Sequence, residues 1–219
     1  MRTTAVVVST RNSEVKVSCA DGVVYLIDDD AAFREGLADL LASYGVSVVS
    51  FTSSREFMSY KRVESAACLL LDLHLPDVNG LDLQSHLTEE RALPIIFMSG
   101  RGDIASSVKA MKGGAVEFLT KPMDSAVLLN AIREAWQKDE INRREWLQLA
   151  ELRERLARLS PREREVLPLI VQGVRTKQAA FALGVAEVTL QLHRSRIIKK
   201  MEATSVADLV KMATRLSIY

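Results

Sequence analysis

Apolar runs and helical repeats alternate through the first two thirds of the chain. Five runs have the length and boundaries of buried strands, namely residues 23–27, 46–51, 67–71, 94–98 and 115–119. Between them, apolar side chains recur at steps of three and four residues, as from Phe33 to Tyr44. This alternation is typical of a parallel sheet with helices on both faces. The pattern therefore predicts a doubly wound, five-stranded α/β domain.

The helical repeats between and after these runs have recognisable starts. One helix is predicted over residues 104–112, with Asp103 as its N-cap, and Asp124 begins a long helical pattern. No Pro or Gly interrupts residues 124–159, so we expect one long helix that packs on the sheet and then joins a second module. Leucines recur from Leu149 to Leu159, which fits either pairing with a second copy or a solitary, solvated helix.

Four further helices are predicted after residue 159. The stretch from Ser160 to Glu163 is a capping box with proline at the first helical position. Thr176 is the expected cap of a short helix, and a glycine-containing turn separates that helix from a basic one over residues 187–201. We expect Val188, Leu192 and Ile198 to form the apolar face of this basic helix. Two helices joined by such a turn predict a helix-turn-helix domain.

Composition supports two modules with different partners. The chain has 219 residues; residues 1–150 carry a net charge of −5 and residues 151–219 a net charge of +6. A basic C-terminal module fits either a nucleic-acid partner or an ordinary solvated surface. No apolar run approaches ~18 residues, and no secretory signal or disulfide framework is present, so we expect a cytoplasmic protein without a membrane partner. Residues 1–21 are expected to form a poorly ordered leader.

Polar residues follow four of the predicted strands at their carboxyl ends. They are Asp28 to Asp30, Asp72, Ser99 and Lys121. Ligands bind at this edge of parallel sheets, and clustered carboxylates suit Mg²⁺. The Asp72 carboxylate would then be a nucleophile for a phosphoryl group, with Lys121 and Ser99 contacting the phosphoryl oxygens.

Residues 22–135 resemble the receiver domain of a two-component response regulator. The resemblance rests on the residues just named, together with Leu75-Pro76, Gly80, Ser99-Gly100 and Lys121-Pro122. The resemblance implies that Asp72 is the phosphoacceptor. It also implies Mg²⁺ ligands: the side chains of Asp29 and Asp72, the backbone carbonyl of His74, and Asp28, which would bind directly or through water. Ser99 and Phe118 match the family's switch pair, and the Lys121-Pro122 bond is expected to be cis.

Residues 159–219 resemble the LuxR/NarL type of helix-turn-helix domain. The segments that carry this resemblance are Leu159 to Leu167 and Leu183 to Arg194. Joined to a receiver, this is similar to the FixJ group of regulators. The resemblance implies base contacts from Gln191, Leu192 and Ser195. It implies phosphate contacts from Lys177, Thr189, His193, Arg194 and Lys199, although His193 fits helix packing equally well. Gln191 replaces a lysine common at its position, and glutamine suits adenine.

The combined prediction is a DNA-binding transcription regulator that a sensor histidine kinase phosphorylates on Asp72, with dimerisation on phosphorylation. We expect a receiver domain over residues 22–137, a helical linker over 138–158 and the DNA-binding domain over 159–219. The alternatives are a regulator that binds DNA without phosphorylation and an aspartyl-phosphate enzyme. The enzyme requires a second acid two residues after the nucleophile, where this chain has His74, so we expect no enzyme. The signal, the kinase and the operator are not predicted.

Overall fold

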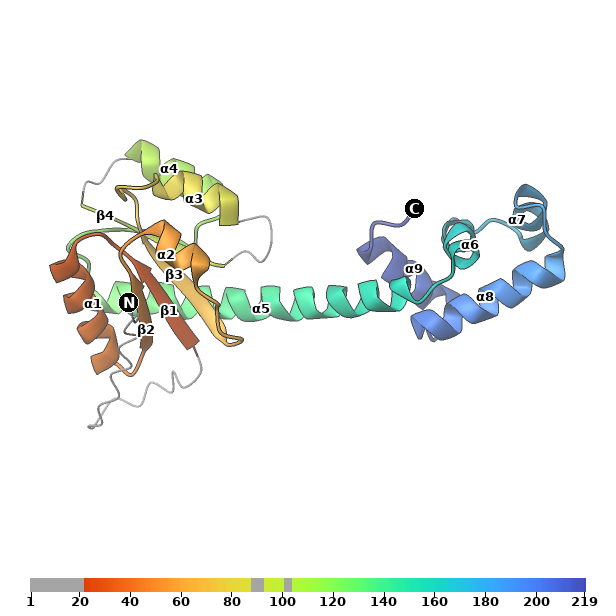
Figure 1. Ribbon diagram of the computed structural model, residues 1–219, viewed down its shortest axis with the longest axis horizontal. Helices are drawn as coiled ribbons and strands as arrows, with labels where there is room; N and C mark the ends of the chain where they lie inside the picture. The colour runs from red at the N-terminus through yellow and green to blue at the C-terminus, as the bar shows by residue number, and fades with distance from the viewer. Residues whose placement is uncertain (1–21, 88–92, 101–103) are drawn as a thin grey trace. The chain divides into compact units, whose positions relative to one another are not determined.

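The structure is a computed structural model that describes residues 22–87, 93–100 and 104–219 (Figure 1). The predictions for residues 1–21 and for Asp103 lie outside the described residues. The chain divides into two compact units, of which the first ends at Arg143 and the second begins at Arg144. No helix of the described part is long and apolar enough to cross a membrane.

Five parallel strands form the sheet of the described N-terminal unit, in the order β2-β1-β3-β4-β5. Their bounds are β1 Gly22–Ile27, β2 Ser47–Phe51, β3 Ala66–Asp72, β4 Ile95–Ser99 and β5 Glu117–Thr120. The central β1 and β3 pair in register, with Ile27 opposite Leu71. Because both faces of a parallel sheet are covered, these strands read as continuous apolar runs. The predicted fold class is confirmed.

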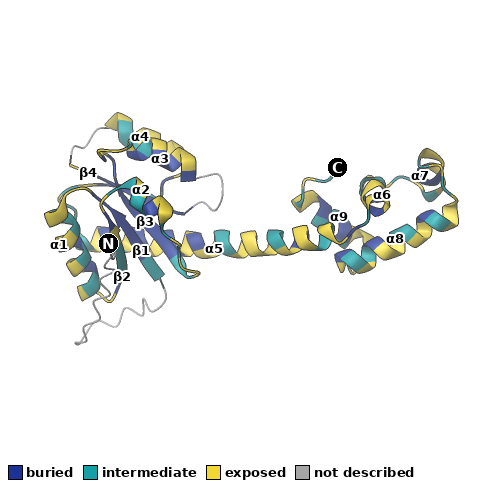
Figure 2. Ribbon diagram, viewed as in Figure 1, coloured by how far each residue is buried: buried dark blue, intermediate teal, exposed yellow. Residues whose placement is uncertain are grey.

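Helices cover both faces of this sheet (Figure 2). They are α1 Ala31–Ser43, α2 Ser54–Ser59, α3 Gly80–Leu87, α4 Ile104–Lys112 and α5 Ser125–Ala157. Alternate strand residues point to two separate cores: Leu71 packs on the side that includes residues of α2, α3 and α4, and Leu70 on the side of α1 and α5. The last strand begins two residues later than predicted and ends one residue later, and the Ala115 N–H instead donates to the Ala110 carbonyl of α4.

The described C-terminal unit has four helices after α5, and they enclose a third core. Their bounds are α6 Pro161–Val171, α7 Thr176–Ala182, α8 Glu187–Met201 and α9 Val206–Arg215. The capping box of Ser160 and Glu163 at the start of α6 is confirmed. The prediction that Thr176 caps α7 is wrong, because the N-cap is Arg175 and no side-chain hydrogen bond caps that helix.

Two predictions about buried faces change. Helix α8 buries Leu190, Ile197 and Met201, whereas Val188 and Leu192 are exposed, so its predicted apolar face is wrong for those two residues. In α5, the leucine repeat does not form a solitary, solvated helix. Leu152 is buried, and Leu156 packs against the C-terminal core together with Leu159. Pairing of this segment with a second copy stays a prediction.

Candidate functional site

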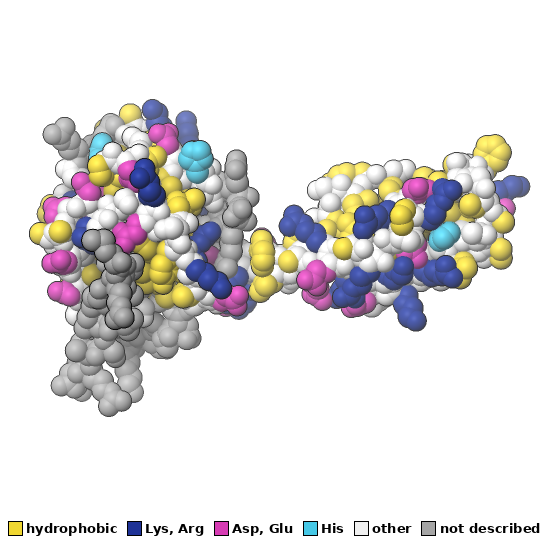
Figure 3. Space-filling view, viewed as in Figure 1, with side chains coloured by type: hydrophobic (Ala, Val, Ile, Leu, Met, Phe, Trp, Pro, Cys, Tyr) yellow, Lys and Arg dark blue, Asp and Glu magenta, His cyan; other side chains and the backbone are white. Residues whose placement is uncertain are grey.

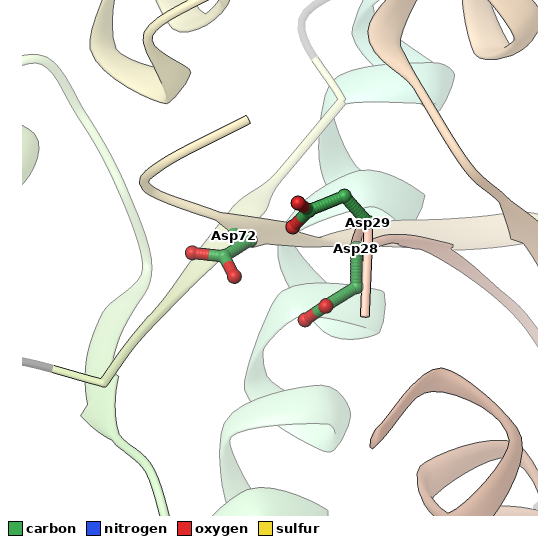
Figure 4. Close-up of side chains that lie close together, drawn as sticks. All are labelled: Asp28, Asp29 and Asp72. Carbon is green, nitrogen blue, oxygen red and sulfur yellow. The ribbon is translucent and has the colours of Figure 1, made fainter. Parts of the chain in front are cut away.

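Three carboxylates gather where β1 and β3 end. Asp28 and Asp29 follow β1, Asp72 is the last residue of β3, and the two strands are parallel neighbours. One oxygen from each side chain lies within 4.8 Å of the others (Figure 4). Asp28 has no exposed surface and Asp72 is only 8% exposed. Such oxygen-only clusters fit a hard dication.

Lys121 supplies the compensating charge from the end of β5. Its Nζ lies 2.6 Å from Asp28 Oδ2 and 2.7 Å from Asp72 Oδ2. Burial lowers the pKa of the Lys121 ammonium, but the hydrogen bonds to Asp28 and Asp72 raise it, and the net pKa lies above its usual value. Burial raises the pKa of the Asp28 carboxyl above its usual value, against the lowering effect of Lys121. The ammonium therefore remains charged between two carboxylates.

Ser99 and Phe118 come from the two strands that complete this side of the sheet. Ser99 is the last residue of β4 and is fully buried, and its backbone carbonyl accepts a hydrogen bond of 2.8 Å from the Lys121 N–H. Phe118 lies on β5 opposite Phe97, with ring centroids 6.4 Å apart, and is half-buried. The Lys121-Pro122 bond is cis, as expected.

The loop after Asp72 closes tightly around the candidate acceptor. The His74 N–H donates to Asp72 Oδ1 at 3.1 Å, and the His74 side chain is exposed. The Gly80 N–H donates to the Leu73 carbonyl at 3.0 Å. A Cβ on Gly80 would lie 2.9 Å from the Asp72 carbonyl oxygen, so a larger residue would push this loop away. The backbone at His74 is thereby held beside the carboxylates.

Two residues of α1 join the site without having been predicted. The Phe33 ring centroid lies 4.1 Å from Lys121 Nζ, a cation–π distance. Arg34 Nη1 donates to the Asp28 carbonyl at 2.8 Å. Their place in the sequence could have indicated this role. The Asp30 side chain caps α1, so the first turn of α1, which contains both residues, lies at the end of β1.

Helix α8 of the second unit presents the predicted DNA-contacting residues. With about 3.6 residues per turn, Leu192, Ser195 and Lys199 lie opposite the buried Leu190 and Ile197. Gln191 lies beside this exposed stripe and is itself exposed.

The remaining predicted contacts differ in exposure. Thr189, His193 and Arg194 are only partly exposed, whereas Lys177 lies exposed on α7. His193 Nδ1 is buried without a hydrogen-bond partner among the described residues. Lys and Arg side chains are numerous on the visible face of the C-terminal unit (Figure 3).

Comparison with known families decides the identity of both units. Residues 24–133 match the family described as response regulator receiver domain, and residues 157–213 match the family described as bacterial regulatory proteins, luxR family. The chain belongs to the response regulators with a LuxR-type DNA-binding domain. This response regulator is therefore a transcription regulator of two-component systems, and its family implies a sensor kinase and DNA as partners.

Relatives and a solved structure extend over nearly the whole chain. Nodulation protein W of Bradyrhizobium diazoefficiens is 41% identical over 90% of this chain and 87% of its own length. The transcriptional regulatory protein FixJ of Azorhizobium caulinodans is 38% identical over 87% of this chain and 90% of its own. The structure of response regulator StyR is 38% identical, covers 90% of this chain and 100% of its own, and gives a TM-score of 0.70. The predicted resemblance to the FixJ group is confirmed.

Proposed function

We propose that Asp72 accepts a phosphoryl group from a sensor histidine kinase and that this modification controls DNA binding by α8. The observation that carries the proposal is Lys121 Nζ, which bridges the buried Asp28 and the candidate acceptor Asp72. Such an arrangement places a carboxylate nucleophile beside a fixed positive charge at a sheet edge where ligands bind.

The donor set fits Mg²⁺. Asp28, Asp29 and Asp72 offer oxygen ligands within 4.8 Å of one another, and the backbone carbonyl of His74 is the fourth candidate. Asp29 is exposed, whereas Asp28 and Asp72 are buried, so the exposed Asp29 is the member of the group that faces solvent. When bound, the ion supplies positive charge beside the acceptor carboxylate and the phosphoryl oxygens.

The residues around Asp72 account for the transfer. An oxygen of Asp72 forms the new P–O bond, while the P–N bond to the kinase's histidine breaks and the imidazole keeps the electron pair. Lys121 is held within 2.7 Å of that carboxylate and stabilises charge on the phosphoryl oxygens. The Ser99 hydroxyl, at the end of the neighbouring β4, is the hydrogen-bond donor that moves toward the phosphoryl group as Phe118 turns inward.

The movement of Ser99 and Phe118 changes the surface that α4, β5 and α5 form. Ile104 is 80% exposed, and Val108, Met111 and Val127 are also exposed, which is apolar area available for a second copy. We propose that phosphorylation promotes a homodimer here. Two copies of α8 would then contact two half-sites of double-stranded DNA.

DNA recognition is assigned to α8, with one further contact from α7. Gln191, Leu192 and Ser195 contact base edges, and Lys177, Thr189, His193, Arg194 and Lys199 contact phosphates. The basic charge of residues 151–219, +6 overall, favours such a surface.

The test is binding to an operator enriched from random DNA by the protein itself. Beryllofluoride with Mg²⁺ serves as the phosphoryl mimic, and fluorescence anisotropy reports affinity. We expect tighter binding with beryllofluoride for the wild type and no change for Asp72→Asn. Equal operator affinity with and without the mimic would identify a phosphorylation-independent regulator instead.

A further inference from the structure

The C-terminal end of helix α8 is attached to the last turns of α5. Arg155 Nη1 donates to the Met201 carbonyl at 3.3 Å, and Arg155 Nη2 lies 3.1 Å from Glu202 Oε2. The same Nη2 lies 2.6 Å from Glu151 Oε1, one turn earlier in α5. The Arg155 side chain is only 17% exposed, whereas the Glu151 and Glu202 side chains are more than half exposed, so the bond to the Met201 carbonyl is the best shielded of the three.

This contact satisfies groups that a helix end leaves open. The last carbonyls of a helix have no partner within it, and the end carries partial negative charge. Glu202 caps α8 in the left-handed conformation, with φ 56°, which is uncommon for a non-glycine residue. Arg155 binds both the Met201 carbonyl and this capping residue. Its guanidinium therefore helps to define where α8 ends.

The last turns of α5 also contribute apolar and polar contacts to the C-terminal unit. Leu152 is buried, Leu156 packs against the C-terminal core, and Gln148 Oε1 accepts a hydrogen bond of 2.9 Å from Arg215 of α9. In the turn after α5, Arg158 Nη1 also lies 3.2 Å from Glu202 Oε1. A third ion pair joins α8 to α6, since Lys200 Nζ lies 2.7 Å from the buried Glu163 Oε2. The end of α8 is thus fixed from α5 and from α6 independently.

We propose that Arg155 is a positioning residue for DNA binding, through which the last turns of α5 set the position of α8. The inference rests on the proposed role of α8 in DNA recognition. Lys199 lies three residues before Glu202, and Ser195 one turn before Lys199, so movement of this end shifts side chains of the DNA-contacting stripe. Because α5 is one helix from Ser125 to Ala157, it begins in the first unit and ends at this contact.

The test compares three variants of the full-length protein. Arg155→Met keeps the apolar stem but removes the guanidinium, while Arg153→Met removes the same charge from an exposed site on α5. Ile170→Val trims a buried residue of α6 and serves as a stability control. Operator affinity is measured at several salt concentrations and below the unfolding temperature of every variant. Amide hydrogen exchange is followed along α8.

We expect Arg155→Met to weaken operator binding roughly tenfold more than Arg153→Met, as the loss of bonds to a charged group implies. Its salt dependence should match that of Arg153→Met, because neither arginine is one of the proposed phosphate contacts. Exchange should accelerate in the last two turns of α8 and remain slow in α6. Ile170→Val should lower the unfolding temperature with little change in affinity.

The inference is overturned if Arg155→Met binds the operator as tightly as Arg153→Met. It is also overturned if Ile170→Val loses as much affinity as Arg155→Met for the same loss of thermal stability. Failure of the proposed function is distinguishable. In that case Gln191→Ala would bind selected DNA like the wild type, whatever Arg155→Met does.

Discussion

Lys121 Nζ lies 2.7 Å from Asp72 Oδ2, so the candidate acceptor is already ion-paired when a phosphoryl group arrives. The same ammonium holds Asp28 at 2.6 Å, and Asp28 is the more deeply buried carboxylate. A single lysine therefore offsets the cost of placing two acids at one sheet edge. Stability and phosphoryl transfer depend on the same side chain.

Replacing this lysine should affect both properties. Without Mg²⁺, Lys121→Met should lose about 1–3 kcal/mol of unfolding free energy, because Asp28 Oδ2 and Asp72 Oδ2 both lose the ammonium that bonds them. Added Mg²⁺ should raise its unfolding temperature more than that of the wild type. Phosphorylation by acetyl phosphate should slow roughly 10²-fold. Lys109→Met, an exposed change on α4, is the control, and a Lys121→Met rate equal to the control rate would contradict the account.

Phe33 should tune the position of that ammonium. Phe33→Leu removes the ring that lies 4.1 Å from Lys121 Nζ, and the loss of a cation–π contact is worth about 0.5–1 kcal/mol. Phosphorylation by acetyl phosphate should therefore slow roughly two- to fivefold. Phe33→Trp should retain the rate, because its ring also attracts a cation. If leucine and tryptophan variants react at equal rates, the ring has no electrostatic role.

The Glu163 carboxylate should make the stability of the second unit pH-dependent. Burial raises the pKa of Glu163, but bonds from Lys200 and Ser160 lower it, and the net pKa lies below its usual value. A lowered pKa adds stability above the unfolded value of 4.5, and this stability is lost as pH falls through the folded pKa.

The variant that isolates this effect is Glu163→Gln, which keeps a capping-box acceptor but no charge. It should be less stable than the wild type by about 1–3 kcal/mol near neutral pH, with a smaller difference as pH falls below the usual glutamate pKa. Glu165→Gln, an exposed change in the same helix, should show neither effect. Thermal unfolding against pH measures this, and a constant difference across the range would count against the ion pair with Lys200.

Two residues of α8 should separate specificity from affinity. Gln191→Ala should change base preference at one operator position, since a glutamine amide can bond the adenine edge. Arg194→Ala should weaken binding to all sequences alike and reduce the salt dependence by about one charge. Binding to the selected operator, to single-base variants and to random DNA measures both. Equal losses on specific and random DNA for both variants would contradict these assignments.

Much of the fold follows from sequence because buried parallel strands are long apolar runs and their carboxyl ends share one edge. The same rule predicts that Asp28 and Asp72 lie close together, as they do. It could not find Phe33, because an apolar residue on a helical face looks like core until Lys121 is placed beside it. The sequence pattern also does not show which side chains of α8 are exposed. Val188 and Leu192 have helical spacing, and only the position of Leu190 and Ile197 in the core shows which face is buried.

Polar contacts over long sequence distances were the least predictable. Asp139 lies in a charged stretch that suggests a solvated helix, yet it is 1% exposed, and its Oδ2 accepts the Ala67 N–H at the start of β3. Arg155 and Met201 are also far apart along the chain, at 46 residues. Such pairs depend on tertiary packing, and no local pattern encodes them.

The site of phosphorylation shows directly whether Asp72 is the phosphoacceptor. Full-length wild type and Asp72→Asn are incubated with acetyl phosphate and Mg²⁺, and intact mass and peptide mapping follow the added phosphoryl group. We predict that the wild type gains one phosphoryl group on the peptide containing Asp72 and that Asp72→Asn gains none. Labelling of Asp72→Asn equal to that of the wild type would contradict the account.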